Sequence, residues 1–185
     1  MKKIYIVRHC EANGQPSESS LTQKGFEQSI ELNQFFSTKQ IDRIISSPFL
    51  RAIQSIEPTV KSKQLKLEID NRLAERILST KEYPDWLKRL EETYNDVELN
   101  FEGGESSKEA TLRVLSLIEE VINNKFEHTI IVTHGNLMSL LLRHYDQEFG
   151  FEQWKMLSNP DVFELNVETH QTMHKRIWNE IKVNN

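Results

Sequence analysis

Cysteine is almost absent from this sequence: Cys10 is the single one in 185 residues. One thiol cannot form an internal disulfide, and sparse cysteine is typical of a protein in a reducing compartment. Long apolar runs are lacking too, because residues 130–142 are interrupted by His134, Gly135 and Asn136. The apolar run after the N-terminal Met-Lys-Lys is too short for the core of a signal peptide. We therefore expect a cytoplasmic protein without a membrane partner.

An excess of positive charge is also lacking, since the formal net charge is -5. This argues against nucleic acid as a partner, because a phosphate backbone needs a basic surface. No Gly-x4-Gly-Lys phosphate loop occurs. The Cys-x5-Arg motif of cysteine phosphatases fails, because Pro16 stands where Cys10 would need an arginine. No paired histidine and aspartate spacing indicates a metal site, so we expect neither a metal nor another cofactor.

What is present is an ordinary globular composition, 37% hydrophobic and 28% charged. A chain of 185 residues can bury a substantial core without covalent staples. No repeat, low-complexity tract or linker divides it, so residues 1–185 are expected to form one domain. No sequence feature indicates an oligomeric state.

The most informative stretch is residues 4–11, Ile-Tyr-Ile-Val-Arg-His-Cys-Glu. Four apolar residues, β-branched and aromatic among them, predict a buried strand. In an open α/β sheet, side chains just past the carboxyl end of such a strand face the crevice where ligands bind. Arg8 and His9 are therefore candidate site residues. The polar loop 11–20 that follows is a candidate binding loop.

Two later stretches place further basic residues at the ends of strands. Residues 43–46 predict a short strand, after which Ser47 is suited to the N-cap of a helix and Pro48 to its first turn. Arg51 would then lie at a helix N-terminus, which favours an anion, and its guanidinium matches a phosphate. Residues 129–133 predict a buried strand that leads through His134 into a helix ending near residue 144.

The other elements are predicted from periodicity. Residues 21–36 predict a helix whose apolar face holds Phe26, Ile30 and either Leu32 or Phe36. Residues 65–69 alternate as an edge strand does, and Glu75 follows close enough to face the same crevice.

Residues 76–105 are expected to form a cap insertion over the site rather than a separate domain. One helix is predicted within it, with Trp86 or Leu87, Leu90 and Tyr94 on the apolar face.

A longer helix is predicted to follow, opened by a capping box of Ser106 and Glu109 and running to about residue 123. Its expected apolar face is Ala110, Val114, Leu117, Ile118 and Val121. A short helix near Trp154 and strands over 162–167 and 175–178 close the chain.

Five short motifs occur in order: Val7-Arg8-His9, Leu21-Thr22-x-x-Gly25, Ser46-Ser47-Pro48-x-x-Arg51-Ala52, Gly104-Glu105-Ser106 and Val132-Thr133-His134-Gly135. Together they resemble the histidine phosphatase superfamily, in the branch that includes cofactor-dependent phosphoglycerate mutase. The resemblance spans residues 4 to at least 140. It implies a three-layer α/β sandwich with a central, mostly parallel sheet and a histidine that becomes phosphorylated.

The resemblance also implies roles for individual residues. His9 matches the nucleophile and Glu75 the general acid, while Arg8, Arg51 and His134 match the phosphate pocket. A polar residue of the following loop also binds phosphate in this family, and both Gln15 and Asn13 are candidates for it. Cys10 stands where the family usually has glycine, and a glycine usual shortly after the acid motif is missing.

The chemistry of these groups is self-consistent. Guanidinium and imidazole groups can neutralise a phosphate without a metal, a neutral imidazole is a competent nucleophile, and a carboxylic acid can protonate the departing alkoxide. The sequence thus predicts a metal-independent phosphomonoester hydrolase acting on a small phosphorylated metabolite.

Two alternatives stay open, a cofactor-dependent phosphoglycerate mutase and an inactive phosphate-ligand-binding regulatory module. The segment between Glu75 and Gly104 bears on the first, because it holds four basic residues and seven acidic ones. Acidic residues there would disfavour the multiply charged intermediate of a mutase. These residues are Arg76, Lys81, Lys88 and Arg89, against Glu82, Asp85, Glu91, Glu92, Asp96, Glu98 and Glu102.

Overall fold

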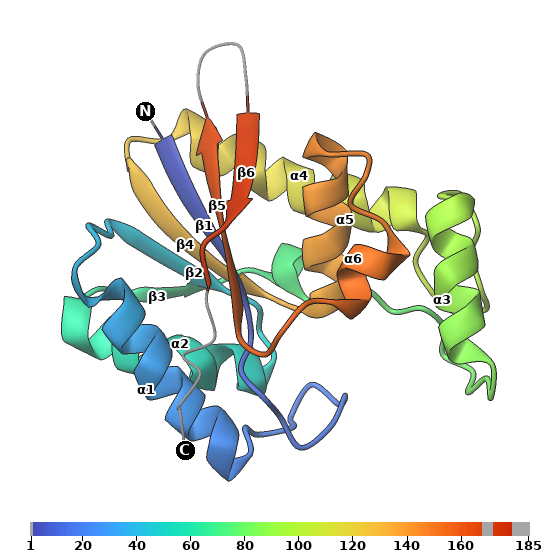
Figure 1. Cartoon of the computed structure of the whole chain (residues 1–185), viewed down its shortest axis with the longest axis horizontal. Coiled ribbons are helices and arrows are strands. Elements are labelled where there is room, and N and C mark those ends of the chain that lie inside the picture. The colour runs from blue at the N-terminus through green and yellow to red at the C-terminus, as the bar shows by residue number, and fades with distance from the viewer. Residues whose placement is uncertain (1, 168–171, 179–185) are drawn as a thin grey trace.

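A six-stranded sheet with helices on both faces organises the molecule in a computed structural model, which describes residues 2–167 and 172–178 (Figure 1). The strand order is β3-β2-β4-β1-β5-β6. The strands are β1 (Lys2–Arg8), β2 (Arg43–Ser46), β3 (Leu67–Ile69), β4 (His128–Thr133), β5 (Asp161–Val167) and β6 (Thr172–Arg176). The helices are α1 (Gln23–Ser37), α2 (Leu50–Lys63), α3 (Trp86–Asn95), α4 (Ser107–Asn123), α5 (Gly135–Tyr145) and α6 (Phe151–Lys155), with a 3-10 turn over Asn71–Leu73.

The sheet is mostly parallel. Strands β3, β2, β4 and β1 run in the same direction, whereas β5 and β6 pair antiparallel at the other side of β1. Alternate residues of β1 point to opposite faces: Ile4 and Ile6 pack under α4 and α5, and Tyr5 and Val7 pack under α1 and α2. The predicted three-layer sandwich is therefore confirmed.

Helix α4 matches its prediction closely. Ser106 and Glu109 form the capping box, and the five expected apolar residues are all buried. Local sequence signals were sufficient to predict this helix, because the capping box sets where it starts and the apolar residues set which face is buried.

Helix α1 faces the core with a different stripe from the expected one. Phe26 and Ile30 are 43% and 50% exposed, while Gly25, Leu32 and Phe36 are buried. The cause is a close approach by the loop before the helix: a Cβ at position 25 would lie 2.0 Å from the carbonyl oxygen of Glu11. Gly25 thus sets which side of the helix meets the sheet.

Helix α2 begins later than predicted. Phe49 is the N-cap, and its backbone N–H is donated to the Ser47 hydroxyl at 3.3 Å. The same hydroxyl shares a hydrogen bond of 2.7 Å with His134 Nε2, so Ser47 joins the start of α2 to His134 although it is not the N-cap. Arg51 is nonetheless in the first turn of α2.

Strand β6 also differs from the predicted strand over 175–178. It ends at Arg176, and Trp178 is buried beyond its end.

Residues 76–105 hold α3 between two irregular segments, and α3 lies at the far side of α4 and α5 from the strands (Figure 1). Leu90 and Tyr94 are buried as predicted. Trp86 is 50% and Leu87 43% exposed, so neither completes the apolar face. Across the described residues, no helix has both the length and the apolar character to cross a membrane.

Candidate active site

Three parallel strands end at one place and carry the basic residues there. Arg8 is the last residue of β1 and pairs with Thr133, the last of β4. The backbone N–H of His9 is donated to the Thr133 carbonyl at 3.1 Å, so His9 and His134 follow adjacent strands, and their ring centroids lie 5.1 Å apart. This is the crevice expected at the carboxyl ends of the strands.

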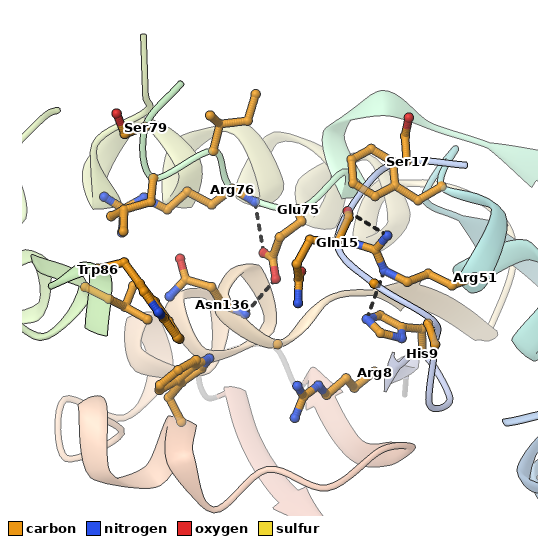
Figure 2. A pocket seen from close by; sticks show the side chains of 18 of the residues that line it. Arg8, His9, Gln15, Ser17, Arg51, Glu75, Arg76, Ser79, Trp86 and Asn136 are labelled. Carbon is orange, nitrogen blue, oxygen red and sulfur yellow. Dashed lines mark hydrogen bonds between the residues drawn. The ribbon is translucent and has the colours of Figure 1, made fainter. Parts of the chain in front are cut away.

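The imidazole of His9 is fixed in one tautomer. Its Nδ1 lies 2.6 Å from the carbonyl oxygen of Cys10, an atom that can only accept, so Nδ1 carries the proton. The Nε2 lone pair is then free to face the cavity, where Arg51 donates to it from Nε at 3.3 Å (Figure 2). Burial, together with the charges of Arg51 and Arg8, lowers the pKa of His9 to about 3. The ring is therefore neutral at physiological pH.

Arg51 is almost fully buried and anchored to the loop after β1. Its Nη1 donates to the carbonyl oxygens of Gln15 and Pro16 at 3.0 and 2.8 Å. The guanidinium also lies over the Phe49 ring, 4.9 Å from its centroid. These contacts hold the guanidinium so that its Nε points at Nε2 of His9.

Arg8 lies on the other side of the His9 ring (Figure 2). Its Nη1 donates to the Leu157 carbonyl at 2.9 Å, while its buried Nε has no hydrogen-bond partner among the described residues. Gly135 makes room for it, because a Cβ there would lie 3.0 Å from the Arg8 guanidinium carbon. Burial lowers the pKa of Arg8 from its usual value, and Glu75 and Asp161 oppose that shift.

His134 is fully buried at the N-cap of α5. Its Nε2 shares a hydrogen bond of 2.7 Å with the Ser47 hydroxyl, and its buried Nδ1 has no partner within the described part of the chain. Burial, then the charges of His9 and Arg51, hold its pKa well below the usual range. A neutral His134 can still donate one hydrogen bond.

The carboxylate of Glu75 sits on the N-terminus of α5. It accepts backbone N–H groups from Leu137 at 3.0 Å, from Asn136 at 3.1 Å and from Arg76 at 2.9 Å. These bonds fix the carboxylate on the opposite side of the cavity from His9 (Figure 2). A group held there can reach an atom bound between the two.

The two loop candidates differ in position. Asn13 donates its side-chain amide to the carbonyls of Leu21 and Ser20 at 2.9 and 3.3 Å and does not line the cavity. Gln15 lines the cavity, and its side chain lies between Glu75 and His9 (Figure 2). The geometry therefore favours Gln15 over Asn13 as the candidate loop residue for phosphate binding.

Cys10 is buried behind the nucleophile rather than in the cavity. Its backbone N–H is donated to the Ser55 hydroxyl at 2.8 Å, and burial raises the pKa of its thiol to about 12. A thiol in this state stays protonated and inert.

Asn159 is a site residue that sequence reasoning missed. It lines the cavity, and its side-chain amide donates to the His9 carbonyl at 2.7 Å. Its own carbonyl accepts from Gln28 at 2.6 Å. The Asn-Pro pair at 159 and 160 signals a turn, but the sequence does not say that this turn returns to β1.

The cavity has a volume of about 1220 Å³. It is lined by residues at the strand ends and in the loop after β1, by the beginnings of α2 and α5, by part of the segment between residues 75 and 90, and by Trp154 and Asn159. Within residues 2–167 and 172–178, no three histidine, cysteine, aspartate or glutamate side chains are grouped as a metal site requires.

An open, mostly parallel α/β sheet that gathers two arginines, two histidines and a carboxylate at its strand ends defines a phosphate-handling enzyme. The family model of the histidine phosphatase superfamily, branch 1, matches residues 4–180. The chain belongs to this family.

Relatives agree with this assignment. Two proteins of Hydrogenobacter thermophilus are each 29% identical to this chain, one over 158 residues (77% of both chains) and one over 151 residues (71% of this chain and 70% of the relative). The second is named phosphoserine phosphatase 1.

Two solved structures share the fold. A mycobacterial glucosyl-3-phosphoglycerate phosphatase with inorganic phosphate is 19% identical, with a TM-score of 0.78 and 97% of each chain covered. A phosphoserine phosphatase variant of Entamoeba histolytica with phosphoserine is 18% identical, with a TM-score of 0.74 and 95% of each chain covered.

Proposed function

We propose that this chain is a metal-independent phosphomonoester hydrolase that acts through a phosphohistidine at His9 on a small phosphorylated metabolite. The single observation that carries the proposal is the state of the His9 ring. Because Nδ1 donates to the Cys10 carbonyl, Nε2 presents a lone pair to the cavity. A neutral, oriented imidazole beside two guanidiniums is what a nucleophile for phosphorus requires.

Arg8, Arg51, His134 and Gln15 form the proposed phosphate site. The guanidiniums supply the charge, and bidentate hydrogen bonds suit a phosphate. On binding, a phosphate oxygen takes over the Nε donor that Arg51 gives to His9. That exchange frees Nε2 at the moment when phosphorus comes within reach.

The reaction then proceeds in two steps. In the first, Glu75 starts as the carboxylic acid, a bond forms between Nε2 and phosphorus, the ester P–O bond breaks, and the departing alkoxide takes the Glu75 proton. In the second, Glu75 takes a proton from water, the resulting hydroxide attacks phosphorus, and the N–P bond breaks. One alcohol and one phosphate leave, and both His9 and Glu75 return to their starting states.

The cap favours hydrolysis over a mutase reaction. A mutase must hold a bisphosphorylated intermediate, which needs free cations over the site. Lys81 pairs with Glu102, and Arg89 pairs with Asp85. Lys88 approaches Glu92 at 4.0 Å. Three of the four basic residues are thus paired with carboxylates. The fourth, Arg76, is buried with Nε on the Glu105 carbonyl at 2.8 Å, and its buried Nη2 has no partner among the described residues.

Turnover of p-nitrophenyl phosphate in excess EDTA tests the proposal. Wild-type protein should release phosphate, and His9→Ala should not. Loss of activity in EDTA that a divalent ion restores would contradict metal independence. No turnover of any phosphomonoester, with phosphate still bound, would favour the inactive binding module.

A second assay separates hydrolase from mutase. With 3-phosphoglycerate and catalytic 2,3-bisphosphoglycerate, we expect phosphate release and little 2-phosphoglycerate. Rapid formation of 2-phosphoglycerate, with little free phosphate from any ester, would overturn the hydrolase assignment.

A further inference from the structure

We propose that the natural substrate is the phosphate ester of an uncharged alcohol that carries a flat, apolar ring, and that Trp86 and Trp154 bind this ring. The inference rests on the proposed hydrolase function and adds the class of leaving group. It follows from the half of the cavity that the phosphate does not occupy.

The cavity extends well beyond the reacting groups. In Figure 2, Trp86 lies on the far side of Glu75 and Asn136 from His9. An ester held with phosphorus at His9 therefore directs its alcohol past Glu75 toward Trp86. Much of the cavity lining that does not belong to the reacting groups is apolar. It includes Ile77, Leu78, Tyr83, Pro84, Trp86, Leu90 and Trp154.

The two tryptophans come from different elements and are held by different contacts. Trp86 is the first residue of α3 and is 50% exposed, so about half of its surface lacks protein cover. Trp154 of α6 stacks on Phe151 at 5.4 Å and 21°, and Phe151 in turn packs against Tyr94 of α3 at 5.9 Å. These aromatic contacts orient Trp154 before any ligand arrives.

Exposed and unpaired positive charge is missing from this half, among the described residues that line it. Lys81 pairs with Glu102. The Arg76 guanidinium is buried: its Nη1 donates to the Thr93 hydroxyl at 2.9 Å, and its buried Nη2 has no partner among the described residues. Glu82 also lines the cavity and adds negative charge.

A leaving group with its own carboxylate, such as serine or glycerate, would thus lose hydration without gaining an ion pair. A neutral ring would instead cover the exposed face of Trp86. Aromatic burial is favourable both through the apolar area removed from water and through ring–ring contacts. The cavity therefore selects against acidic alcohols and for apolar ring-bearing ones.

Three primary alkyl esters test this selection at matched leaving-group chemistry: benzyl, ethyl and serine phosphate. We expect kcat/KM for benzyl phosphate to exceed that for ethyl phosphate by about tenfold, which corresponds to about 1.4 kcal/mol of ring burial. Phosphoserine should fall below both.

Substitutions of the two tryptophans test whether they cause the preference for benzyl phosphate. Trp86→Ala and Trp154→Ala should each lower kcat/KM for benzyl phosphate by about tenfold and leave ethyl phosphate within about twofold. The unchanged ethyl phosphate rate shows that each variant is folded. Leu87→Ala is the matched control, because Leu87 follows Trp86 on α3, is 43% exposed and does not line the cavity.

The outcomes are distinct. His9-dependent hydrolysis that prefers phosphoserine, or tryptophan variants that slow benzyl and ethyl phosphate equally, would overturn the inference and leave the hydrolase function standing. If p-nitrophenyl phosphate is hydrolysed but none of the three alkyl esters is, the inference fails alone. If p-nitrophenyl phosphate is not hydrolysed either, the proposed function fails and this inference fails with it.

Discussion

His9 should make the protein less stable in mild acid, by an amount that follows from its pKa. The ordinary pKa of 6.5 applies to the unfolded chain, and burial and the neighbouring arginines lower the folded value to about 3. Between these values the unfolded chain binds a proton that the folded protein does not. The free energy of unfolding therefore falls as the pH drops below 6.5 and continues to fall until about pH 3.

The magnitude at pH 5 is set by the unfolded chain alone, because the folded ring is still neutral there. The 1.5 pH units below 6.5 correspond to a loss of about 2 kcal/mol relative to pH 8. His9→Gln removes this loss, since glutamine does not titrate and can still accept from Arg51. His134 is present in both proteins, and burial, the largest cause of its lowered pKa, acts in both.

Urea unfolding of wild type and His9→Gln at pH 8, 7, 6 and 5, in phosphate-free buffer, measures the effect. The stability difference between the two proteins should shift by about 2 kcal/mol in favour of the variant from pH 8 to pH 5. A difference that does not change with pH would refute a neutral, buried His9.

Three further predictions concern the surroundings of the nucleophile. Glu75→Gln should slow ethyl phosphate by at least about tenfold more than p-nitrophenyl phosphate, because protonation matters most for a basic leaving oxygen; equal losses would make Glu75 structural. Cys10→Ala should keep most of kcat/KM, and the native thiol should resist iodoacetamide at pH 8, since its pKa is raised to about 12. Gly25→Ala should destabilise the fold by more than about 2 kcal/mol in urea, because its Cβ would clash with the Glu11 carbonyl; stability within about 0.5 kcal/mol of wild type would contradict that contact.

Much of the fold could be predicted because its signals are local. The apolar run before Arg8 and the strand before His134 are buried strands as expected, and the capping box of α4 fixes its own register. Residues that follow adjacent parallel strands must meet at one edge of the sheet. Local signals placed Arg8, His9 and His134 at strand ends, and the resemblance to the histidine phosphatase superfamily implied that they share one pocket.

The errors arise where distant parts of the chain meet. Periodicity placed Phe26 on the core face of α1. Because the Glu11 carbonyl packs against Gly25, the Gly25 side of the helix faces the core and Phe26 is exposed. Capping rules favoured Ser47 as the N-cap of α2, but Phe49 is the N-cap, and the Ser47 hydroxyl also bonds to His134 across 87 positions of the chain.

The same reason explains what sequence reasoning missed at the site. Asn159 contacts the His9 carbonyl across 150 positions, and the pairing of Trp86 with Trp154 in one cavity depends on how α3 and α6 pack. No local pattern encodes these contacts.

The most direct test of the mechanism is to trap the phosphoenzyme. After rapid quench with a ³²P-labelled phosphomonoester, wild-type protein should carry acid-labile, base-stable label on the peptide that contains His9. His9→Ala should carry none and should not turn over, while Cys10→Ala should still be labelled. Label on another residue, or full turnover by His9→Ala, would contradict the phosphohistidine mechanism.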